Sequence, residues 1–348
     1  MGEKFKSSAT MIPLDQAVGK VLAHDITEIT PGRFKGAAFK KGYIIRQEDL
    51  PHLRRIGKNH IFALELVPGE VHEDEAALRL ARVLAGPGTR FDEPPAEGKI
   101  SIRAARRGLL KVNVDALFRL NLIRHMCCAS RRSNDLVEKG DIVAAERVIP
   151  LIISEELLEK AVTLAAAAGG IFSVKPLSPL KAGLVVTGNE IFHGLVEDRF
   201  YPLLKEKLRG YDCELIETIR CPDIRERIVE AIHDLLAAGA ELILVGGGMS
   251  VDPDDVSRTA ITEAGARDVV YGTPVLPGAM FLYGRFGPVP VLGLPACVLF
   301  YRATVFDVLF PRVLAGEIIT REDLAALGHG GLCLNCLECR YPNCAFGK

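Results

Sequence analysis

From Leu180 onward, short apolar runs alternate with segments whose apolar residues recur at helical spacing. Apolar strands joined by amphipathic helices are typical of a parallel sheet that is covered by helices on both faces. Ligands of such sheets bind beyond the carboxyl ends of the strands, so we expect the functional residues in the loops that follow them. The predicted strands are Gly183–Val186, Cys213–Ile219, Glu241–Val245 and Val289–Leu292, and the predicted helices are Phe200–Leu208, Ile224–Leu236, Val256–Ala264 and Cys297–Leu314.

The first half of the chain is less regular. Residues 12–66 predict one small unit that ends at the turn signal Pro68-Gly69, and residues 68–176 predict an irregular α+β region. In the first unit we expect a helix from Pro13 that runs into a strand, a strand at Lys40–Ile45, a helix at Gln47–Ile56 and a strand at Ile61–Val67. In the second we expect helices at Glu73–Leu84 and Ser154–Ala168, and two strands around Gly108.

Composition narrows the class of protein. Hydrophobic residues make up 49% and charged residues 25%, which is typical of a folded globular chain. The 43 basic residues balance 44 acidic ones, so we expect neither nucleic acid nor anionic lipid as the main partner. No apolar run is long enough to span a bilayer, and the polar start MGEKFKSSAT has no secretion-signal core. We therefore expect a cytoplasmic protein.

One basic segment has two interpretations. Between Lys99 and Arg132 there are nine basic residues and a single acid, Asp115. A solvated basic face explains this run and is the favoured interpretation. The functional alternative is that part of the run faces an anionic ligand held by the neighbouring domain.

Three loops after predicted strands carry candidate chemistry. They are Thr187-Gly-Asn-Glu190, the run Gly246-Gly-Gly-Met-Ser250, and Gly293-Leu-Pro-Ala-Cys297. Glycines at a strand end let backbone N–H groups approach an anion closely, and a following helix adds a favourable dipole. These loops predict a phosphate site.

Three aspartates follow the second loop, at positions 252, 254 and 255. Carboxylates beside a phosphate are unfavourable unless a cation bridges them, and Mg²⁺ held by one or two carboxylates and a phosphate is the usual solution. Alternatively, Asp254 or Asp255 caps the helix predicted to begin near Val256.

In order and spacing, these motifs resemble the domain shared by MogA, MoaB and MoeA, proteins that handle molybdopterin during molybdenum cofactor assembly. The matching residues are Thr187-Gly-Asn-Glu190, Asp198, Asp223, Gly247-Gly-Met-Ser250 with Asp255, Pro277-Gly278 and Gly293-Leu-Pro295. Residues 12–66 also look like the start of MoeA. The resemblance therefore covers a little over half of the chain.

The resemblance implies a three-layer α/β domain at 177–318 that binds molybdopterin through its phosphate. It implies a preceding MoeA-like segment at 1–67 and an α+β linker domain at 68–176, and it leaves a cysteine-rich tail at 319–348. It gives Glu190, Asp223 and Asp255 catalytic roles around the pterin, Mg²⁺ and the oxyanion. The implied cofactor-binding residues are Thr187, Gly188, Asn189, Asp198, Gly246, Gly247, Gly248, Ser250, Asp252, Pro277, Gly278, Gly293 and Pro295.

The chain also departs from the family. The usual TGDE is TGNE here, Pro31-Gly-Arg-Phe-Lys-Gly stands where MoeA has a segment containing MDGYA, and the third loop ends in Ala296-Cys297 rather than Gly-Asn. We also expect no counterpart of the β-rich C-terminal domain of MoeA. Binding is therefore a firmer prediction than catalysis.

The C-terminal tail predicts a metal site. Four of the nine cysteines, Cys333, Cys336, Cys339 and Cys344, lie within twelve residues. Such crowding in a reducing compartment indicates metal ligation rather than disulfides. The unbroken C-x2-C-x2-C run favours an iron–sulfur cluster over Zn²⁺, His329 is a substitute ligand, and a flexible reduced tail is the alternative.

The leading hypothesis is a MoeA-like protein that delivers molybdate or tungstate to adenylated molybdopterin, with release of AMP. A second hypothesis is a non-catalytic cofactor carrier or sensor that docks on a molybdoenzyme. A weaker third is a MogA-like adenylyltransferase or a CinA-like nucleotide hydrolase. By analogy with the resembling proteins, we expect a homo-oligomer.

Overall fold

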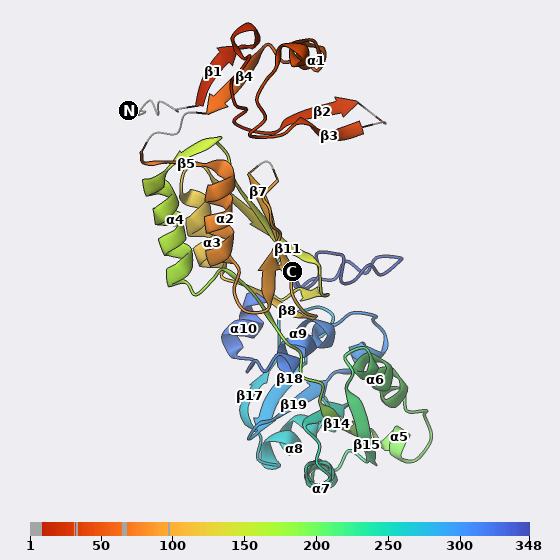
Figure 1. Ribbon diagram of the computed structural model, residues 1–348. Coiled ribbons are helices and arrows are strands. Elements are labelled where there is room, and N and C mark those ends of the chain that lie inside the picture. Colours follow the sequence, from red (N-terminus) through yellow and green to blue (C-terminus); the bar gives the residue numbers. More distant parts are fainter. Residues whose placement is uncertain (1–8, 31, 33, 65–67, 97) are drawn as a thin grey trace. The chain divides into compact units, whose positions relative to one another are not determined.

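A computed structural model describes residues 9–30, 32, 34–64, 68–96 and 98–348, and the chain divides into two compact units, 1–175 and 176–348 (Figure 1). The finer division into four parts stays a prediction. Pro31 and Arg33, in the segment that replaces the family's MDGYA, and the end of the predicted 61–67 strand lie outside the described residues.

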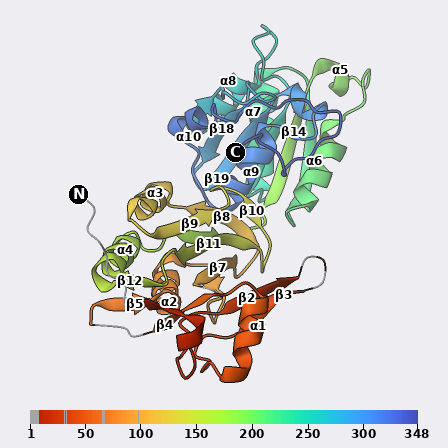
Figure 2. The same ribbon diagram turned by 90° about the horizontal axis from the view of Figure 1, so that it is seen from above.

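The first unit begins with two antiparallel strand pairs, of which only β2 and β3 are consecutive in the chain. Strand β1 (Ala9–Pro13) pairs antiparallel with β4 (His60–Leu64), and β2 (Ile26–Thr30) pairs antiparallel with β3 (Phe34–Phe39) (Figure 2). The helix expected from Pro13 is only the short 3-10 turn η1 (Leu14–Gln16). The expected strand at 40–45 contributes one isolated bridge, between Val21 and Ile44.

The predicted helix at 47–56 is confirmed in two pieces. The 3-10 turn η2 (Gln47–Asp49) runs into α1 (Leu50–Arg55), and the helix stops before Gly57, whose φ of 81° is the left-handed geometry that glycine adopts easily. Leu50 and Leu53 of α1 are buried with Leu22 in the core of this part. A few buried aliphatic side chains therefore hold the segment together.

The rest of the first unit is an α+β structure. Helices α2 (Glu73–Leu84) and α4 (Glu155–Ala167) share an apolar core with α3 (Val114–Leu122), and Ser154 caps α4 by accepting a hydrogen bond from the N–H of Leu157. Both helices predicted in this region are confirmed. Its strands are β5 (Glu70–His72), β6 (Thr89–Phe91), β7 (Lys99–Ala104), β8 (Gly108–Val112), β9 (Met126–Ser130), β10 (Leu136–Val137), β11 (Ile142–Val148), β12 (Ile152–Ser154) and β13 (Phe172–Lys175).

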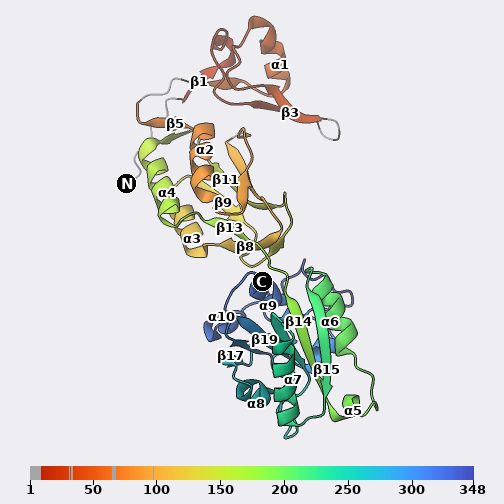
Figure 3. The same ribbon diagram turned by 60° about the horizontal axis from the view of Figure 1, so that its bottom comes forward.

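The second unit contains one six-stranded sheet in the order β15-β14-β16-β19-β18-β17 (Figure 3). The first four strands are parallel, as predicted, but β18 runs antiparallel to both of its neighbours, β19 and β17, so the prediction of a wholly parallel sheet is wrong at this edge. The strands are β14 (Lys181–Thr187), β15 (Glu214–Cys221), β16 (Leu242–Gly246), β17 (Arg267–Tyr271), β18 (Leu282–Phe286) and β19 (Val289–Leu294).

Helices cover both faces of this sheet because its strands are apolar on both sides. On β14, Leu184 and Val186 pack into the cluster that contains α6 (Phe200–Arg209) and α9 (Val305–Leu314). The intervening Val185 packs with α7 (Arg225–Ala237) and α8 (Ser257–Glu263) on the other face. The remaining short helices are α5 (Asn189–Phe192) and α10 (Arg321–Ala326).

The predicted helix 297–314 is wrong in its first half. A 3-10 turn η3 (Ala296–Leu299) is followed by a break, and α9 starts only after Thr304. Thr304 caps the helix together with Asp307, whose carboxylate accepts from the N–H of Thr304 at 2.8 Å. This capping box satisfies N–H groups that a continuous helix would have paired internally. Among the described residues, none of the helices has the length and apolar character needed to cross a membrane.

Candidate functional site

The first two glycine-containing loops meet at the carboxyl ends of β14 and β16. Thr187, 3% exposed, places its Oγ1 at 3.2 Å from the Oγ of Ser257 and donates to the carbonyl of Gly246 at 3.5 Å. Gly247 and Gly248 have φ of 96° and 62°. A Cβ on Gly247 would lie 2.7 Å from the Thr187 carbonyl, and one on Gly248 would lie 2.3 Å from the Ser257 hydroxyl. Both positions therefore need glycine.

The second loop is also fixed from two other sides. The N–H of Gly247 donates to the carbonyl of Leu294 at 3.3 Å, and a Cβ on Gly293 would lie 2.6 Å from the sulfur of Met249. The hydroxyl of Tyr271 donates to the carbonyl of Met249 at 2.7 Å. The structure thus brings the start of the third loop, Gly293, against the second, while Pro295 begins the η3 turn.

This loop has the properties of an anion site. Within the described part of the chain, the backbone N–H groups of Gly248, Met249 and Ser250 meet no acceptor. The Arg258 guanidinium lies over the ring of Tyr271, 4.7 Å from its centroid, and so places a cation beside the residue that holds Met249. Successive N–H groups at a glycine-rich turn bind anions such as phosphate.

A second pole of the site is acidic. The N–H of Asn189 donates to Oδ2 of Asp223 at 2.9 Å, and the N–H of Asp223 donates to Oδ1 of Asn189 at 3.2 Å. Burial raises the pKa of the Asp223 carboxyl, the N–H of Asn189 lowers this pKa, and the carboxylates of Glu190, Asp255 and Asp254 raise it. These acids are therefore close enough to repel one another.

The aspartates after the second loop do not cap the following helix. The residue that precedes α8 is Val256, and no side chain caps that end. Instead, Oδ1 of Asp252 accepts from the N–H of Asp254 at 3.2 Å, and the carbonyl of Asp252 accepts from the N–H of Asp255 at 3.0 Å. The capping alternative is wrong, and the carboxylates of Asp254 and Asp255 lie near enough to Asp223 to raise the pKa of its carboxyl.

Other predicted residues lie elsewhere or have structural partners. Asp198 accepts from the N–H of Tyr201 at 3.1 Å, at the start of α6, and forms an ion pair with Arg220 at 2.9 Å. Pro277 accepts from the N–H of Val305 at 3.2 Å, and a Cβ on Gly278 would lie 2.4 Å from a methyl of Val305. These two residues therefore pack on the start of α9.

Two residues that hold the site together were not predicted from the sequence. Ser257 is fully buried against Thr187 and Gly248, and Tyr271 anchors Met249. The sequence signal for Ser257 is weak, because a serine at a helix start most often suggests capping. Tyr271 lies on β17, which was not expected, so no signal pointed to it.

No preformed metal centre accompanies these groups. Within the described residues, no three or more His, Cys, Asp or Glu side chains are arranged to hold a metal ion. The acidic pole fits a divalent cation in charge and in donor type, since carboxylate oxygens are the ligands that Mg²⁺ prefers. The four tail cysteines are free thiols that line one common cavity.

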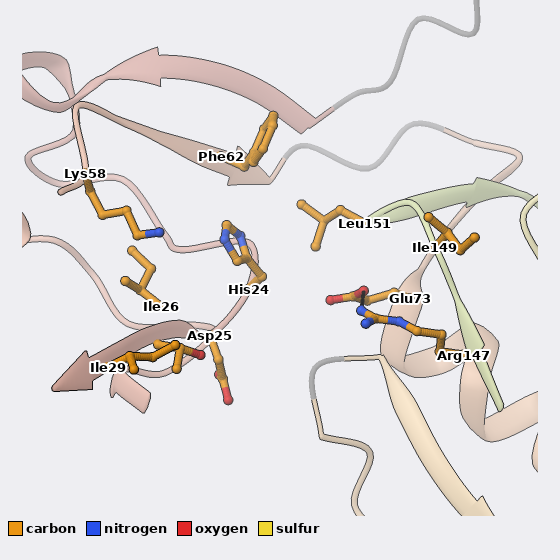
Figure 4. A pocket seen from close by; sticks show the side chains of 11 residues that line it. His24, Asp25, Ile26, Ile29, Lys58, Phe62, Glu73, Arg147, Ile149 and Leu151 are labelled. Atoms are coloured by element: carbon orange, nitrogen blue, oxygen red, sulfur yellow. Dashed lines mark ion pairs between the residues drawn. The ribbon is translucent and has the colours of Figure 1, made fainter. Parts of the chain in front are cut away.

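A separate cavity of about 440 Å³ lies in the first unit, among residues that no sequence prediction singled out. Figure 4 shows His24 and Lys58 on one side and Glu73 and Arg147 on the other. Glu73 and Arg147 form a long ion pair at 3.9 Å. The size suits a small molecule, but the lining carries charges of both signs and does not single out one class of ligand.

The second unit is thus an α/β domain with an anion loop and an acidic pole at the carboxyl ends of its parallel strands. Residues 183–315 match the sequence model of a family described as "Probable molybdopterin binding domain". The resemblance to the molybdopterin-binding family of molybdenum cofactor biosynthesis is confirmed for this segment. Residues 11–65 match a "Domain of unknown function (DUF8806)", which attaches no activity to them.

Individual relatives cover parts of the chain. A "CinA-like protein" of Mycobacterium sp. (strain MCS) is 31% identical over 93 residues, 27% of this chain and 22% of the relative. A "Molybdopterin molybdenumtransferase" of Synechococcus elongatus is 25% identical over 142 residues, 38% of this chain and 35% of the relative. The chain therefore spans about a fifth to a third of the length of these two curated relatives.

Among solved structures, the molybdopterin biosynthesis enzyme MoaB of Thermus thermophilus is similar with a TM-score of 0.33 and 20% identity. The similarity covers 40% of this chain and 98% of the MoaB chain.

Proposed function

We propose that the second unit binds molybdopterin through its phosphate at the loop Gly246–Ser250. The observation that carries this proposal is the loop itself: two positive-φ glycines packed on Thr187 and Ser257, with backbone N–H groups that have no acceptor among the described residues. A phosphate ester is the part of molybdopterin that such a loop recognises by charge and hydrogen bonding.

We further propose that the chain is a metal-insertion protein of the molybdopterin molybdenumtransferase type. Its substrates are adenylated molybdopterin and molybdate or tungstate, and AMP leaves as the metal joins the pterin dithiolene. In this proposal Asp223, with Glu190 and Asp255, holds Mg²⁺ near the phosphate and the oxyanion. Neutralisation of their mutual repulsion would favour cation binding.

A non-catalytic carrier or sensor is the second candidate. The observation in its favour is Asn189, which replaces a family carboxylate and here exchanges hydrogen bonds with Asp223. A neutral amide removes one potential ligand from the acidic pole, so cation affinity falls. A carrier would still bind the pterin phosphate at the loop but would not catalyse metal insertion.

One assay separates these functions. The full chain is purified anaerobically and given adenylated molybdopterin, Mg²⁺ and molybdate, and AMP release is followed. The insertion proposal expects release that needs both Mg²⁺ and molybdate, and that falls by at least ~100-fold in Asp255→Asn, as for the loss of a group that stabilises charge in the reaction. Asp234→Asn, an exposed acid on α7, is the matched control and should behave like the wild type.

Other outcomes decide against insertion. Tight pterin binding without AMP release leaves the carrier as the function. Nucleotide hydrolysis without any requirement for molybdate would support a CinA-like hydrolase instead. Failure to bind molybdopterin in any form would overturn the proposal as a whole.

A further inference from the structure

The tail after α10 is fixed to the second unit although residues 327–348 form no helix or strand. Phe346, 3% exposed, lies in the core that contains α6 and α9. The hydroxyl of Tyr341 donates to the carbonyl of Asp307 at 3.0 Å. Leu276 donates its N–H to Gly331 and accepts from the N–H of Cys333, both at 2.8 Å. The tail therefore has a defined path over the domain.

All four tail cysteines line one cavity. Cys333, Cys336, Cys339 and Cys344 line a cavity of about 100 Å³ together with Tyr301, Arg302, Tyr341 and neighbouring residues. Asn335, with φ of 50°, makes a left-handed turn between the first two cysteines. Cys333 and Cys339 are half-buried against the domain, whereas Cys336 and Cys344 are exposed.

The chemistry of this lining favours a soft metal. All nine cysteines are free, so no disulfide joins the tail to the domain. No three thiols are already gathered at metal-ligand spacing in the described chain, and loading must draw them together. Four thiolates around one divalent ion carry a net charge of about −2. Arg302 and Arg340 line the same cavity and can offset that charge.

We propose that Cys333, Cys336, Cys339 and Cys344 hold one thiolate-coordinated metal centre that locks the tail onto the cofactor domain. The centre is a single soft ion or an iron–sulfur cluster, since both use the same four-thiolate coordination. Metal binding to a segment without regular structure supplies folding free energy, because the unbound segment lacks cross-links.

The tail also contacts the segment that contains Pro277 and Gly278. Leu276 pairs directly with the tail at Gly331 and Cys333, and the next residue, Pro277, accepts from Val305 at the start of α9. Ordering the tail should therefore also order residues 274–278. Only the meaning of this segment as part of a pterin site rests on the proposed function; the metal centre does not.

The test uses the full chain, freed of metal by a chelator under anaerobic conditions, and no pterin. In one arm Co²⁺ alone is titrated, and thiolate charge-transfer and tetrahedral Co²⁺ absorption are recorded. In the other arm iron and sulfide are supplied, and cluster absorption is recorded. We expect one centre per chain in at least one arm, and the arm that responds tells a single ion from a cluster.

Cys336→Ser and Cys344→Ser change exposed residues and leave the buried core untouched. Each should weaken binding by at least ~100-fold, the upper range for loss of even an outer-shell partner. Cys127→Ser, an exposed cysteine of the first unit, is the control and should bind like the wild type. A wild type that takes up neither metal, or tail variants that bind as well as the wild type, would overturn the proposal.

Hydrogen exchange then tests the lock. Loading should slow amide exchange in residues 327–348 and 274–278 of the wild type and of Cys127→Ser, and should leave Cys336→Ser unchanged. Stoichiometric loading without slower exchange in either segment contradicts the lock. Because no pterin is present, these results do not depend on whether the chain binds molybdopterin.

Discussion

The two units of this protein differ in how a buried ionisable side chain is paired. In the second unit Arg312 is 6% exposed and fully engaged: its Nε donates to Glu317 at 2.8 Å and its Nη2 donates to Asp323 at 2.5 Å. In the first unit Glu146 is 1% exposed, and neither carboxylate oxygen has a hydrogen-bond partner among the described residues. Glu146 faces Cys128 across the β9–β11 pair.

A buried polar side chain can connect two structural elements, as Arg312 does, or it can only lower the stability of the fold, as Glu146 does. Arg312 ties the end of α9 to the cap of α10, just before the cysteine tail, so its charge is matched where it is buried. Burial raises the pKa of Glu146 to about 9, and the side chain avoids the cost of a buried charge by remaining protonated. The first unit therefore carries a buried, unpaired carboxyl that loses stability when it must ionise, whereas the buried charge of Arg312 in the second unit is matched.

Removing the ion pairs of Arg312 should cause the largest loss of stability. Arg312→Leu leaves Glu317 and Asp323 facing each other without their cation, and we expect a loss of about 3–5 kcal/mol in the free energy of unfolding. Urea unfolding, followed by hydrogen exchange in residues 176–348, measures it. Arg209→Leu, an exposed position on α6, is the control and should stay within about 0.5 kcal/mol of the wild type. A loss below about 1 kcal/mol for Arg312→Leu would show that the Arg312 ion pairs do not stabilise the connection between α9 and α10.

Removing the ionisable group at Glu146 should change the pH profile of the first unit. The unfolded carboxyl ionises near 4.5, whereas the folded one keeps its proton up to about pH 9. Because folding raises the pKa of this carboxyl, its contribution to the free energy of unfolding is most favourable below pH 4.5. That contribution is lost as the pH rises from 4.5 to 9, and it stays constant at higher pH. The slope in this window is about 1.4 kcal/mol per pH unit.

Glu146→Gln should lack that slope and should be more stable than the wild type at alkaline pH. Unfolding of residues 70–175, followed by hydrogen exchange across the pH window, tests this. Glu156→Gln, an exposed acid on α4, is the matched control and should keep the wild-type profile. Parallel profiles for wild type and Glu146→Gln would mean that Glu146 ionises normally and that the contrast between the units is wrong.

A glycine pair sharpens the claim that the second unit is built around its phosphate loop. Gly247 and Gly265 have nearly equal φ, 96° and 99°, but only a Cβ on Gly247 meets a neighbour, the Thr187 carbonyl at 2.7 Å. Alanine at Gly265 should cost about 1 kcal/mol in stability from backbone strain, and alanine at Gly247 should cost more because its Cβ also meets the Thr187 carbonyl. Only Gly247→Ala should also weaken molybdopterin binding, by roughly tenfold or more, equivalent to about 1.4 kcal/mol. Equal binding by the two variants would show that the close approach at Gly247 has no role.

The smallest effect concerns the acidic pole. Glu190→Gln removes one of the charges that raise the pKa of Asp223, so this pKa should fall. Carboxyl-carbon NMR titration of Asp223 measures the shift, and Asp234→Asn serves as a control that should leave it unchanged. An unchanged pKa in Glu190→Gln would mean that the two carboxylates do not share a site.

Much of the second unit could be predicted from its sequence because its signals are local. Apolar strands alternate with helices of the right period up to Glu263, and glycines mark the strand ends. The break before α9 was also visible as Thr304-x-x-Asp307, a capping-box spacing that the apolar pattern around it obscured. Strands β17 and β18 were not predicted, although β18 joins β19 through the two residues Gly287-Pro288, which is a local hairpin signal.

The remaining misses have a tertiary cause. Asp198 fits the family pattern in sequence, but its partner Arg220 comes from β15, and no spacing predicts that ion pair. Likewise, the sequence Val143 to Val148 does not show that Glu146 faces the core, because a bulge between Ile142 and Ala144 sets which residues point inward. Local patterns therefore located the glycine-rich turn Gly246–Ser250, while packing decided which charged residues are paired.

We propose that the loop Gly246–Ser250 holds the phosphate of molybdopterin. Equilibrium binding of molybdopterin and of its dephosphorylated form to the anaerobic full chain tests it most directly. We expect the phosphorylated pterin to bind at least ~10-fold more tightly, as the loss of a charge-assisted hydrogen bond of about 1.5–3 kcal/mol implies. We also expect Gly247→Ala to reduce that preference. Equal affinity for the two forms would contradict the claim.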